Sequence, residues 1–236
     1  MAETIDEGAK APYHLGIIPD GNRRWTRRSR INLREGYYTG IMKLVDGAIW
    51  AKELGIKVIT SWALSKENLQ NRSSLELNTL YKLYIKVALD KKIRRTIDDN
   101  GIRIKIVGEL NLLPKNVREA LKDLESHTSK NSDIIANILF CYSGNDDILY
   151  ALRKSSRMKN FKDDESSFRN NLISKDIPDL DLIIRTSGEM RLSGFLPLQS
   201  TYAELYFTDK YWPEVQKKDL EDAVKEFARR KRRFGK

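Results

Sequence analysis

An acidic residue, a glycine and two arginines follow directly after an apolar run in the segment HLGIIPDGNRRW, residues 14–25. Backbone amides at the start of a helix attract phosphate oxygens, and Gly21 lets the chain approach them closely. Arg24 can add a charge-assisted contact to the same phosphate. Asp20 would repel a phosphate unless a divalent cation lay between them, and Mg²⁺ commonly bridges carboxylates and substrate phosphates. The segment therefore predicts a metal-diphosphate site, although Asp20 as a helix N-cap beside surface arginines explains the same residues.

A second group of residues suited to anion binding lies in the segment that begins RTSGEMRLS. Arg185 ends an apolar run, and Arg191 and Ser193 follow shortly after it. Two arginines, a hydroxyl and loop amides favour a second anion pocket. Glu204 opens another apolar run, where an unpaired carboxylate would be costly without a cation. Two alternatives stay open: Arg185 pairs with Glu189, and Glu204 lies exposed at the end of a strand.

Short apolar runs that are typical of buried strands alternate with longer helical patterns along the chain. The strand-like runs are 14–19, 57–64, 102–108, 134–142, 180–186 and 204–208. Helices are expected at 37–55, 75–97, 114–127, after Gly144 and at 218–232. This alternation favours a single α/β domain with a mostly parallel central sheet of about six strands, flanked by helices. Ligands of such sheets gather at the carboxyl ends of the strands, and both groups of polar residues lie at such ends.

The chain of 236 residues has 43 Lys plus Arg against 33 Asp plus Glu, which gives a net charge of +10. Such a charge points to an anionic partner, which is nucleic acid, anionic lipid or a phosphorylated small molecule. No apolar run is long enough to span a bilayer and the first residues do not resemble a secretory signal, so we expect a soluble or peripheral protein. The lone Cys141 forbids an intramolecular disulfide and is compatible with a cytoplasmic location. With His14 and His127 it cannot form a standard zinc cluster.

Four segments of the chain resemble the motifs of the cis-prenyltransferases, whose best-known members are undecaprenyl diphosphate synthases. They read HLGIIPDGNRRW (14–25), SKEN (65–68), RTSGEMRLSGFLPLQSTYAELYF (185–207) and the ending RRKRRFG (229–235). The resemblance implies a cis-prenyltransferase domain at 12–236 after a flexible N-terminal segment at 1–11. It also implies an apolar tunnel, a homodimer, and condensation of isopentenyl diphosphate with an allylic diphosphate primer to give a polyprenyl diphosphate.

The resemblance also implies roles for individual residues, by matched position. Asp20 would hold Mg²⁺ on the allylic diphosphate, and Glu204 would contribute to the metal site. The catalytic group would comprise Asp20, Asn22, Ser65, Glu67 and Asn68. The residues around the allylic diphosphate would be Gly21, Asn22, Arg23, Arg24 and Trp25. The residues that bind isopentenyl diphosphate would be Arg185, Arg191 and Ser193, with Arg233 and Gly235 reaching the site of the partner subunit.

Several residues depart from the family pattern around the expected reaction centre. Leu33 stands where an arginine is usual, Tyr37 where a histidine is usual, and Gly194 where an asparagine is common. The segment LPLQ at 196–199 also replaces the usual L-L-W-Q. A short-chain synthase or an irregular synthase, which joins C5 units head-to-middle, therefore stays open. Ordinary chain elongation is favoured by three residues that match regular members: Asn22, Glu67 and Gln199.

A basic nucleic-acid-binding protein is the main alternative from another class, since positive charge and basic helices are its electrostatic footprint. No recognised nucleic-acid module occurs in the sequence, so no nucleic-acid partner is expected. A catalytically silent subunit of a heteromeric synthase would lack the loop acid, and Asp20 argues against it. His14 is expected to be structural, with a phosphate contact as the alternative. An apolar product predicts peripheral membrane contact for its release.

Overall fold

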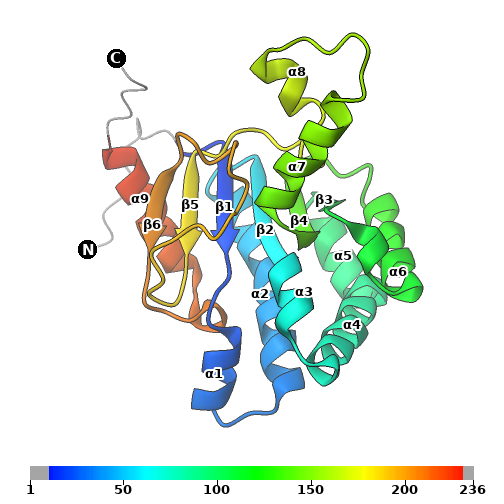
Figure 1. Cartoon of the computed structure of the whole chain (residues 1–236). Helices are drawn as coiled ribbons and strands as arrows, with labels where there is room; N and C mark the ends of the chain where they lie inside the picture. Colours follow the sequence, from blue (N-terminus) through cyan, green and yellow to red (C-terminus); the bar gives the residue numbers. More distant parts are fainter. Residues whose placement is uncertain (1–10, 231–236) are drawn as a thin grey trace.

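The computed structural model describes residues 11–230, and its centre is a six-stranded sheet whose neighbouring strands all run parallel (Figure 1). The strands are β1 (His14–Ile18), β2 (Val58–Ser65), β3 (Ile102–Val107), β4 (Ile134–Tyr142), β5 (Leu182–Arg185) and β6 (Glu204–Phe207). Their order across the sheet is β3-β4-β2-β1-β5-β6. The prediction of a single α/β domain with a parallel sheet of about six strands is confirmed.

Helices cover both faces and one end of this sheet. They are α1 (Asn22–Arg28), α2 (Leu33–Glu53), α3 (Lys66–Asn71), α4 (Ser74–Leu89), α5 (Lys91–Asp99), α6 (Lys115–His127), α7 (Gly144–Ser155), α8 (Glu165–Arg169) and α9 (Lys217–Arg229), with 3₁₀ turns at Leu110–Leu112 and Trp212–Glu214. The single helix expected at 75–97 is wrong, because the pattern divides at Asp90 into α4 and α5. The Asp90 carboxylate accepts hydrogen bonds from the amides of Lys92 at 2.9 Å and Ile93 at 3.1 Å and so caps α5. Within residues 11–230, no helix is both long enough and apolar enough to cross a bilayer.

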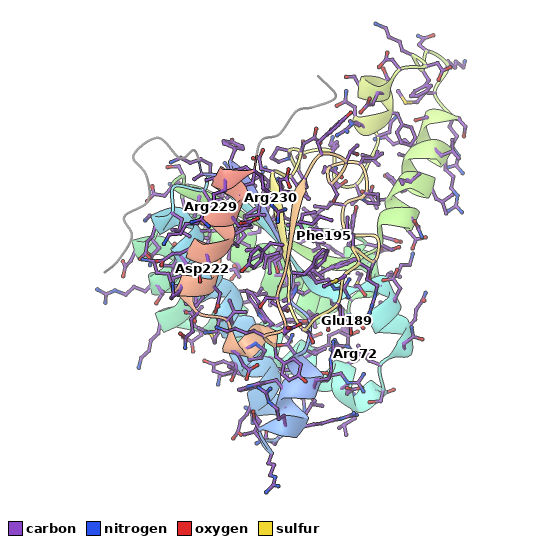
Figure 2. All side chains as sticks on the ribbon, turned by 90° about the vertical axis from the view of Figure 1, so that its left-hand side faces the viewer. Arg72, Glu189, Phe195, Asp222, Arg229 and Arg230 are labelled. Atoms are coloured by element: carbon purple, nitrogen blue, oxygen red, sulfur yellow. The ribbon has the colours of Figure 1, made fainter. Side chains whose placement is uncertain are left out.

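Apolar side chains cover both faces of the sheet, as expected for parallel strands. On one face, Leu15 packs in a core that α2 and α9 complete. On the other face, Ile18 packs against Phe195, which Figure 2 shows beside the sheet. Phe195 comes from the irregular segment 186–203 and lies so close to β1 that a Cβ atom on Gly16 would be 2.8 Å from its ring. This irregular segment thus covers part of the sheet face, as a helix would, and it reaches the carboxyl edge of the sheet.

Strands β1 and β5 lie side by side although they come from opposite ends of the chain. Their register places Ile18 beside Arg185, so the loops that follow the two strands leave the sheet at the same edge. The Thr186 hydroxyl joins these loops, since it accepts from the amide of Asp20 at 2.8 Å and donates to its carbonyl at 2.8 Å. Strand β1 also divides the sheet: β2, β3 and β4 lie on one side of it, and β5 and β6 lie on the other. The strand order therefore changes direction at β1. Open α/β sheets bind ligands at such switch points.

Candidate active site

A pocket of about 720 Å³ lies at the carboxyl ends of β1, β2 and β5. This volume falls in the range of pockets that bind small molecules. Its lining includes residues from three of the motif segments: Asp20, Gly21, Asn22, Arg23, Arg24, Ser65, Glu67, Asn68, Arg185 and Ser193. The fold therefore brings most of the predicted site residues to one place.

The Asp20 carboxylate joins the two arginine-bearing loops of the pocket. Its Oδ2 accepts a hydrogen bond from Arg185 at 3.0 Å, and its Oδ1 accepts from Arg24 at 3.2 Å and from the Gly21 amide at 2.6 Å. Burial would raise the pKa of Asp20, but the hydrogen bonds from Arg185 and Gly21 and the arginine charges lower it overall. The carboxylate is therefore ionised at neutral pH. The alternative of Asp20 as a helix N-cap is wrong, because Gly21, at φ 93°, holds that position without a side-chain cap.

Asn22 is held at the start of α1 by a close contact with α2. Its Nδ2 donates to the carbonyl of Pro19 at 3.0 Å. Its Oδ1 is buried and has no hydrogen-bond partner among the described residues. A Cβ atom on Gly40 would lie 2.1 Å from this oxygen, so only glycine at that position leaves the amide where it is. The Asn22 amide therefore keeps one unpaired acceptor oxygen, which packs against Gly40.

Arg185 ends β5 and is almost fully buried, with 4 % of its surface exposed. Besides Asp20, its guanidinium donates to the Ser193 hydroxyl at 2.9 Å and to the carbonyl of Arg191. Ser193 has a left-handed backbone with φ 52°, which turns the loop back toward β5. The Nε atom of Arg185 is buried and makes no hydrogen bond within residues 11–230. Arg185 and Ser193 therefore form a cationic wall with one donor still free.

Glu189 joins two arginines of the site. Its Oε1 accepts from Nη1 of Arg24 at 3.0 Å, and its Oε2 pairs with Nη1 of Arg191. The pairing of Arg185 with Glu189 that the sequence left open is not formed, because Arg185 pairs with Asp20 instead. A row of alternating charges results, in the order Arg185, Asp20, Arg24, Glu189 and Arg191. Both arginine-bearing loops are thus joined through carboxylates.

The SKEN segment starts α3 at the end of β2. The Ser65 hydroxyl accepts from the Asn68 amide at 3.1 Å and so caps the helix. Lys66 anchors the helix through ion pairs of 2.7 Å to carboxylates of two neighbouring elements, Glu109 and Asp146. Glu67 and Asn68 lie in the first turn of α3 and line the pocket. The cap and the ion pairs fix these two side chains at the pocket wall.

Tyr37, where the family pattern has a histidine, belongs to a charged network. The Arg72 guanidinium lies 5.2 Å from the centre of the Tyr37 ring, and the Tyr37 hydroxyl donates to Glu76 at 3.1 Å. The same Glu76 oxygen pairs with Nε of Arg23 at 3.2 Å. Burial raises the pKa of Tyr37, so its hydroxyl keeps the proton at neutral pH. Tyr37 therefore connects α1, α2 and α4 at the wall of the pocket, which it lines.

Glu204 is not brought to Asp20 within one chain. It begins β6 and lies in register with Leu182 at the start of β5, about 10 Å along the sheet from the carboxyl edge. Its carboxylate accepts from Arg230 at 3.0 Å and remains 26 % exposed. In Figure 2, Arg230 lies above Phe195 and Glu189 lies below it. The alternative of Glu204 exposed at a strand end fits in part, because Glu204 does begin a strand but is only partly exposed and pairs with Arg230.

Two further predicted residues, Trp25 and Arg191, do not line the pocket, although Arg191 reaches it through its carbonyl and through Glu189. Arg233 and Gly235 lie outside the described residues. The contact of Arg233 and Gly235 with the site of a partner subunit therefore stays a prediction.

The pocket is also lined by residues that were not expected there from the sequence. They include Arg27, Gly40, Ile41, Leu44, Trp62 and Trp212. Arg27 could have been found from its helical spacing to Arg23 and Arg24. Trp212 is buried and donates its indole N–H to the carbonyl of Gly40 at 2.9 Å, a long-range contact that leaves no pattern in the sequence.

His14 has a structural role, as expected. It is fully buried, and its Nε2 lies 2.7 Å from the Thr60 hydroxyl and its Nδ1 3.0 Å from the carbonyl of Pro178. Burial lowers the pKa of His14 to about 4, so the ring is neutral near pH 7. Since His14 does not line the pocket, the alternative of a phosphate contact has no support.

Sequence comparison connects this fold and pocket to a known family. A family model described as "Putative undecaprenyl diphosphate synthase" matches residues 18–235. The chain is 42 % identical to the tritrans,polycis-undecaprenyl-diphosphate synthase (GGDP specific) of Sulfolobus acidocaldarius, over 95 % of this chain and 88 % of the relative. It is also 42 % identical to the tritrans,polycis-undecaprenyl-diphosphate synthase (geranylgeranyl-diphosphate specific) of Methanopyrus kandleri, over 100 % of this chain and 88 % of the relative.

Solved structures agree with this assignment. The lavandulyl diphosphate synthase from Lavandula x intermedia, in complex with dimethylallyl diphosphate, has a TM-score of 0.87 and 31 % identity, over 96 % of this chain and 99 % of that one. A probable undecaprenyl diphosphate synthase from Campylobacter jejuni has a TM-score of 0.77 and 27 % identity, over 96 % of this chain and 100 % of that one. The chain therefore belongs to the undecaprenyl diphosphate synthase family, the cis-prenyltransferases, and is a prenyltransferase.

Proposed function

We propose that this prenyltransferase condenses isopentenyl diphosphate with geranylgeranyl diphosphate, in cis-prenyl chain elongation that yields a polyprenyl diphosphate. The names of the relatives from Sulfolobus acidocaldarius and Methanopyrus kandleri state the same primer. The observation that carries the proposal is the Asp20 carboxylate between Arg24 and Arg185, in a pocket that is cationic on one side and apolar on the other. Two cationic loops that share one carboxylate suit two diphosphate substrates.

The arginines would supply the electrostatics of this reaction. The bond between the allylic carbon and its diphosphate oxygen breaks, the isopentenyl double bond forms the new carbon–carbon bond, and loss of a proton leaves a new double bond. Negative charge grows on the departing diphosphate, and preorganised donors and cations at such a position often supply the largest catalytic effect. We assign this role to Arg23, Arg24 and the Gly21 amide, which line the pocket together.

The second substrate would lie against the opposite wall. Arg185 and Ser193 would bind isopentenyl diphosphate through the guanidinium and hydroxyl that now contact each other at 2.9 Å. Holding two reactants side by side lowers the barrier, because orientation is fixed before the reaction. The reacting ends would be oriented by four polar residues of the pocket: Asn22, Ser65, Glu67 and Asn68.

Magnesium is the cofactor that fits the oxygen donors of this pocket. Asp20 lines it, and the buried Oδ1 of Asn22 lacks a hydrogen-bond partner within residues 11–230. Because Mg²⁺ commonly binds one or two carboxylates plus substrate phosphates, Asp20 with diphosphate oxygens satisfies its preference. We assign the ion to Asp20 without Glu204, which lies at the other end of the sheet in the same chain. When bound, Mg²⁺ would neutralise charge on the departing diphosphate.

The apolar side of the pocket would receive the prenyl chain. Its wall is formed by Ile41, Leu44, Ala63, Leu80 and Tyr84. The Tyr84 hydroxyl donates to the carbonyl of Ala63 at 2.8 Å, so a buried polar group is satisfied and the ring can face a hydrocarbon. The small side chain of Ala63 leaves room beside the reacting end. An apolar tunnel that continues from this wall stays a prediction.

A homodimer that forms through α7 is part of the proposal. Leu149, Tyr150 and Leu152 on this helix are 44, 48 and 56 % exposed. Neighbouring apolar side chains on a surface mark interaction sites, and dimers of identical chains are the commonest assemblies. Light scattering on the purified protein should give the mass of two chains, and Leu152→Arg should shift it toward one chain. A wild-type protein with the mass of one chain would contradict this interface.

We also propose product release at a membrane surface and a cytoplasmic location. Leu75 and Met190 are 76 and 78 % exposed, and they adjoin Glu76 and Glu189, which pair with arginines of the pocket. Exposed apolar side chains beside the site could contact lipid. The buried free thiol of Cys141 is in keeping with a reducing compartment. Flotation with vesicles should recover less of a Leu75→Ser, Met190→Ser variant than of the wild type.

An irregular synthase is the second candidate. The similarity to the lavandulyl diphosphate synthase, with a TM-score of 0.87, favours it, as do Tyr37 and the LPLQ segment. The higher identity to the archaeal polycis synthases, 42 % against 31 %, favours ordinary elongation. The carbon connectivity of the product separates the two candidates.

A primer series tests the proposal. Purified protein with Mg²⁺ and labelled isopentenyl diphosphate is given C5, C10, C15 or C20 allylic diphosphates in separate reactions, with Asp20→Ala as the inactive control. We expect incorporation to be fastest with the C20 primer and to end at one long product. A single product one C5 unit longer than its primer would favour the short-chain or irregular class. No incorporation with any primer would contradict the proposed function.

A further inference from the structure

The carboxylate of Glu189 lies between Arg24, which lines the pocket, and Arg191, which the sequence predicts to bind isopentenyl diphosphate beside Arg185. Arg24 donates to its Oε1 at 3.0 Å, and Arg191 pairs with its Oε2. Arg24 follows β1, whereas Glu189 and Arg191 follow β5, so one side chain joins the two loops. The Glu189 side chain is 25 % exposed, and Figure 2 shows Glu189 toward the same end of the molecule as Arg72 of the pocket. A ligand that enters from solvent can therefore reach this bridge.

Glu189 holds the same donor atoms that a diphosphate would use. Guanidinium groups bind carboxylates and phosphates with the same paired geometry, so a carboxylate and a diphosphate compete for one arginine. A hydrogen bond from Arg191 holds the pKa of Glu189 below its usual range, so the competing group is charged at neutral pH. Arg185 does not depend on Glu189, because Asp20 and Ser193 are its partners. The competition thus concerns Arg24 on one side and Arg191 on the other.

We infer that Glu189 is a positioning residue that couples the occupancy of the two diphosphate pockets, an inference that rests on the proposed function. The first diphosphate to bind displaces Glu189 from both arginines, because the bound anion removes one partner of the bridge and repels the carboxylate. The second diphosphate then meets an arginine that is already free. Each substrate therefore favours the binding of the other, and the effect is reciprocal.

Calorimetric titration of the full chain with isopentenyl diphosphate tests this coupling. Each protein is titrated in Mg²⁺ with and without a saturating thiolodiphosphate analogue of the allylic primer, which binds but reacts very slowly. Wild type is compared with Glu189→Gln, which keeps the shape of the side chain and removes its charge. Glu119→Gln on α6 is the matched control, because its carboxylate is 63 % exposed and pairs only weakly with Lys115 at 3.8 Å.

The coupling is the ratio of the Kd without the analogue to the Kd with it. We expect this ratio to be about two- to fivefold larger in the wild type than in Glu189→Gln, the range for ion pairs near the surface. Glu189→Gln should also bind isopentenyl diphosphate alone about two- to fivefold more tightly, because the competing carboxylate is gone. In steady-state assays its KM for isopentenyl diphosphate should fall while kcat stays within about twofold. Glu119→Gln should match the wild type in each measurement.

Equal ratios in the wild type and Glu189→Gln would overturn the inference. So would weaker binding of isopentenyl diphosphate to a Glu189→Gln protein with an unchanged melting temperature, since Glu189 would then only hold the arginines in place. A wild-type protein that binds neither diphosphate would contradict the proposed function itself, and the inference with it. The three results are distinguishable within the one set of titrations.

Discussion

Arg185 donates a 3.0 Å hydrogen bond to Asp20, although 165 positions separate the two residues in the chain. The contact is possible because Ile18 and Arg185 lie side by side in strands β1 and β5. Arg185 is buried, whereas the Asp20 side chain is 30 % exposed and faces the pocket. The pair thus sets the spacing between the two proposed diphosphate sites and leaves the carboxylate accessible to substrate.

Arg185→Lys should lower kcat/KM for isopentenyl diphosphate by about 10- to 100-fold, the equivalent of about 1.5–3 kcal/mol for a hydrogen bond to a charged group. A lysine cannot contact Asp20, Ser193 and the carbonyl of Arg191 at once, as the guanidinium does. Steady-state kinetics with each substrate varied would measure the loss. Arg95→Lys, at an 84 % exposed position on α5, is the control. Equal kinetics for the two variants would show that Arg185 does not contact substrate.

Gly40→Ala should raise the KM for the allylic primer by about tenfold, the equivalent of about 1.4 kcal/mol. The added Cβ would lie 2.1 Å from Oδ1 of Asn22, so the amide must leave its position in the pocket. Gly47→Ala in the same helix is the matched control, because its Cβ would meet Trp212 at an ordinary 3.6 Å. Alanine in a helix is favoured by about 0.5–1 kcal/mol, so Gly47→Ala should be active and at least as stable as the wild type. If both variants keep the wild-type KM, the placement of Asn22 does not matter for primer binding.

Tyr37→Phe should raise the KM for the allylic primer about threefold and leave kcat nearly unchanged. Without the hydroxyl, Glu76 loses one of its donors and holds Arg23 more strongly, which leaves less of that cation for the diphosphate. The loss of one hydrogen bond should lower the free energy of unfolding by about 0.5–1.5 kcal/mol. Kinetic assays and urea denaturation measure the two effects, with Tyr13→Phe at a 58 % exposed position as the control. An unchanged KM would show that the contacts among Tyr37, Glu76 and Arg23 do not affect binding of the primer.

Acid should destabilise the protein through His14. The unfolded residue takes up a proton near its usual pKa of 6.5, whereas burial lowers the pKa of folded His14 to about 4. Between these values the unfolded state binds more protons, so the free energy of unfolding falls as pH drops from about 6.5 to 4, by up to about 3 kcal/mol. Urea denaturation at several pH values measures how steeply the free energy of unfolding falls with pH. This dependence should be weaker for His14→Gln and should equal that of the wild type for His127→Gln, at the exposed histidine. The same slope in His14→Gln and the wild type would contradict this origin.

The sequence predicted those parts of the structure that depend on local patterns. Apolar runs located all six strands, and the loops after β1 and β5 were placed at the carboxyl edge, because strand periodicity and turn residues are encoded nearby. Both groups of polar residues were expected at that edge but as separate anion sites, whereas Asp20 and Arg185 line one pocket. The division at Asp90 was missed, although an aspartate within a helical pattern is a recognisable cap.

The strand order and the partners of charged groups could not be predicted in the same way. The sequence placed Glu204 near the metal; within one chain the register of β6 beside β5 puts it at the other end of the sheet from Asp20, so its metal role stays a prediction. Glu189 was considered as a partner of Arg185, and the structure gives it Arg24 and Arg191 instead. Each of these outcomes depends on long-range register, which one sequence does not reveal.

The product formed from a C20 primer tests the central claim most directly. Wild-type protein with Mg²⁺, geranylgeranyl diphosphate and isopentenyl diphosphate is allowed to react to completion, and the extracted product is analysed by mass spectrometry and by NMR of its double bonds. The account predicts a linear chain extended by several C5 units, with each new double bond cis, and no product from Asp20→Ala. A branched product, new double bonds that are trans, or no extension by a folded wild-type protein would contradict it.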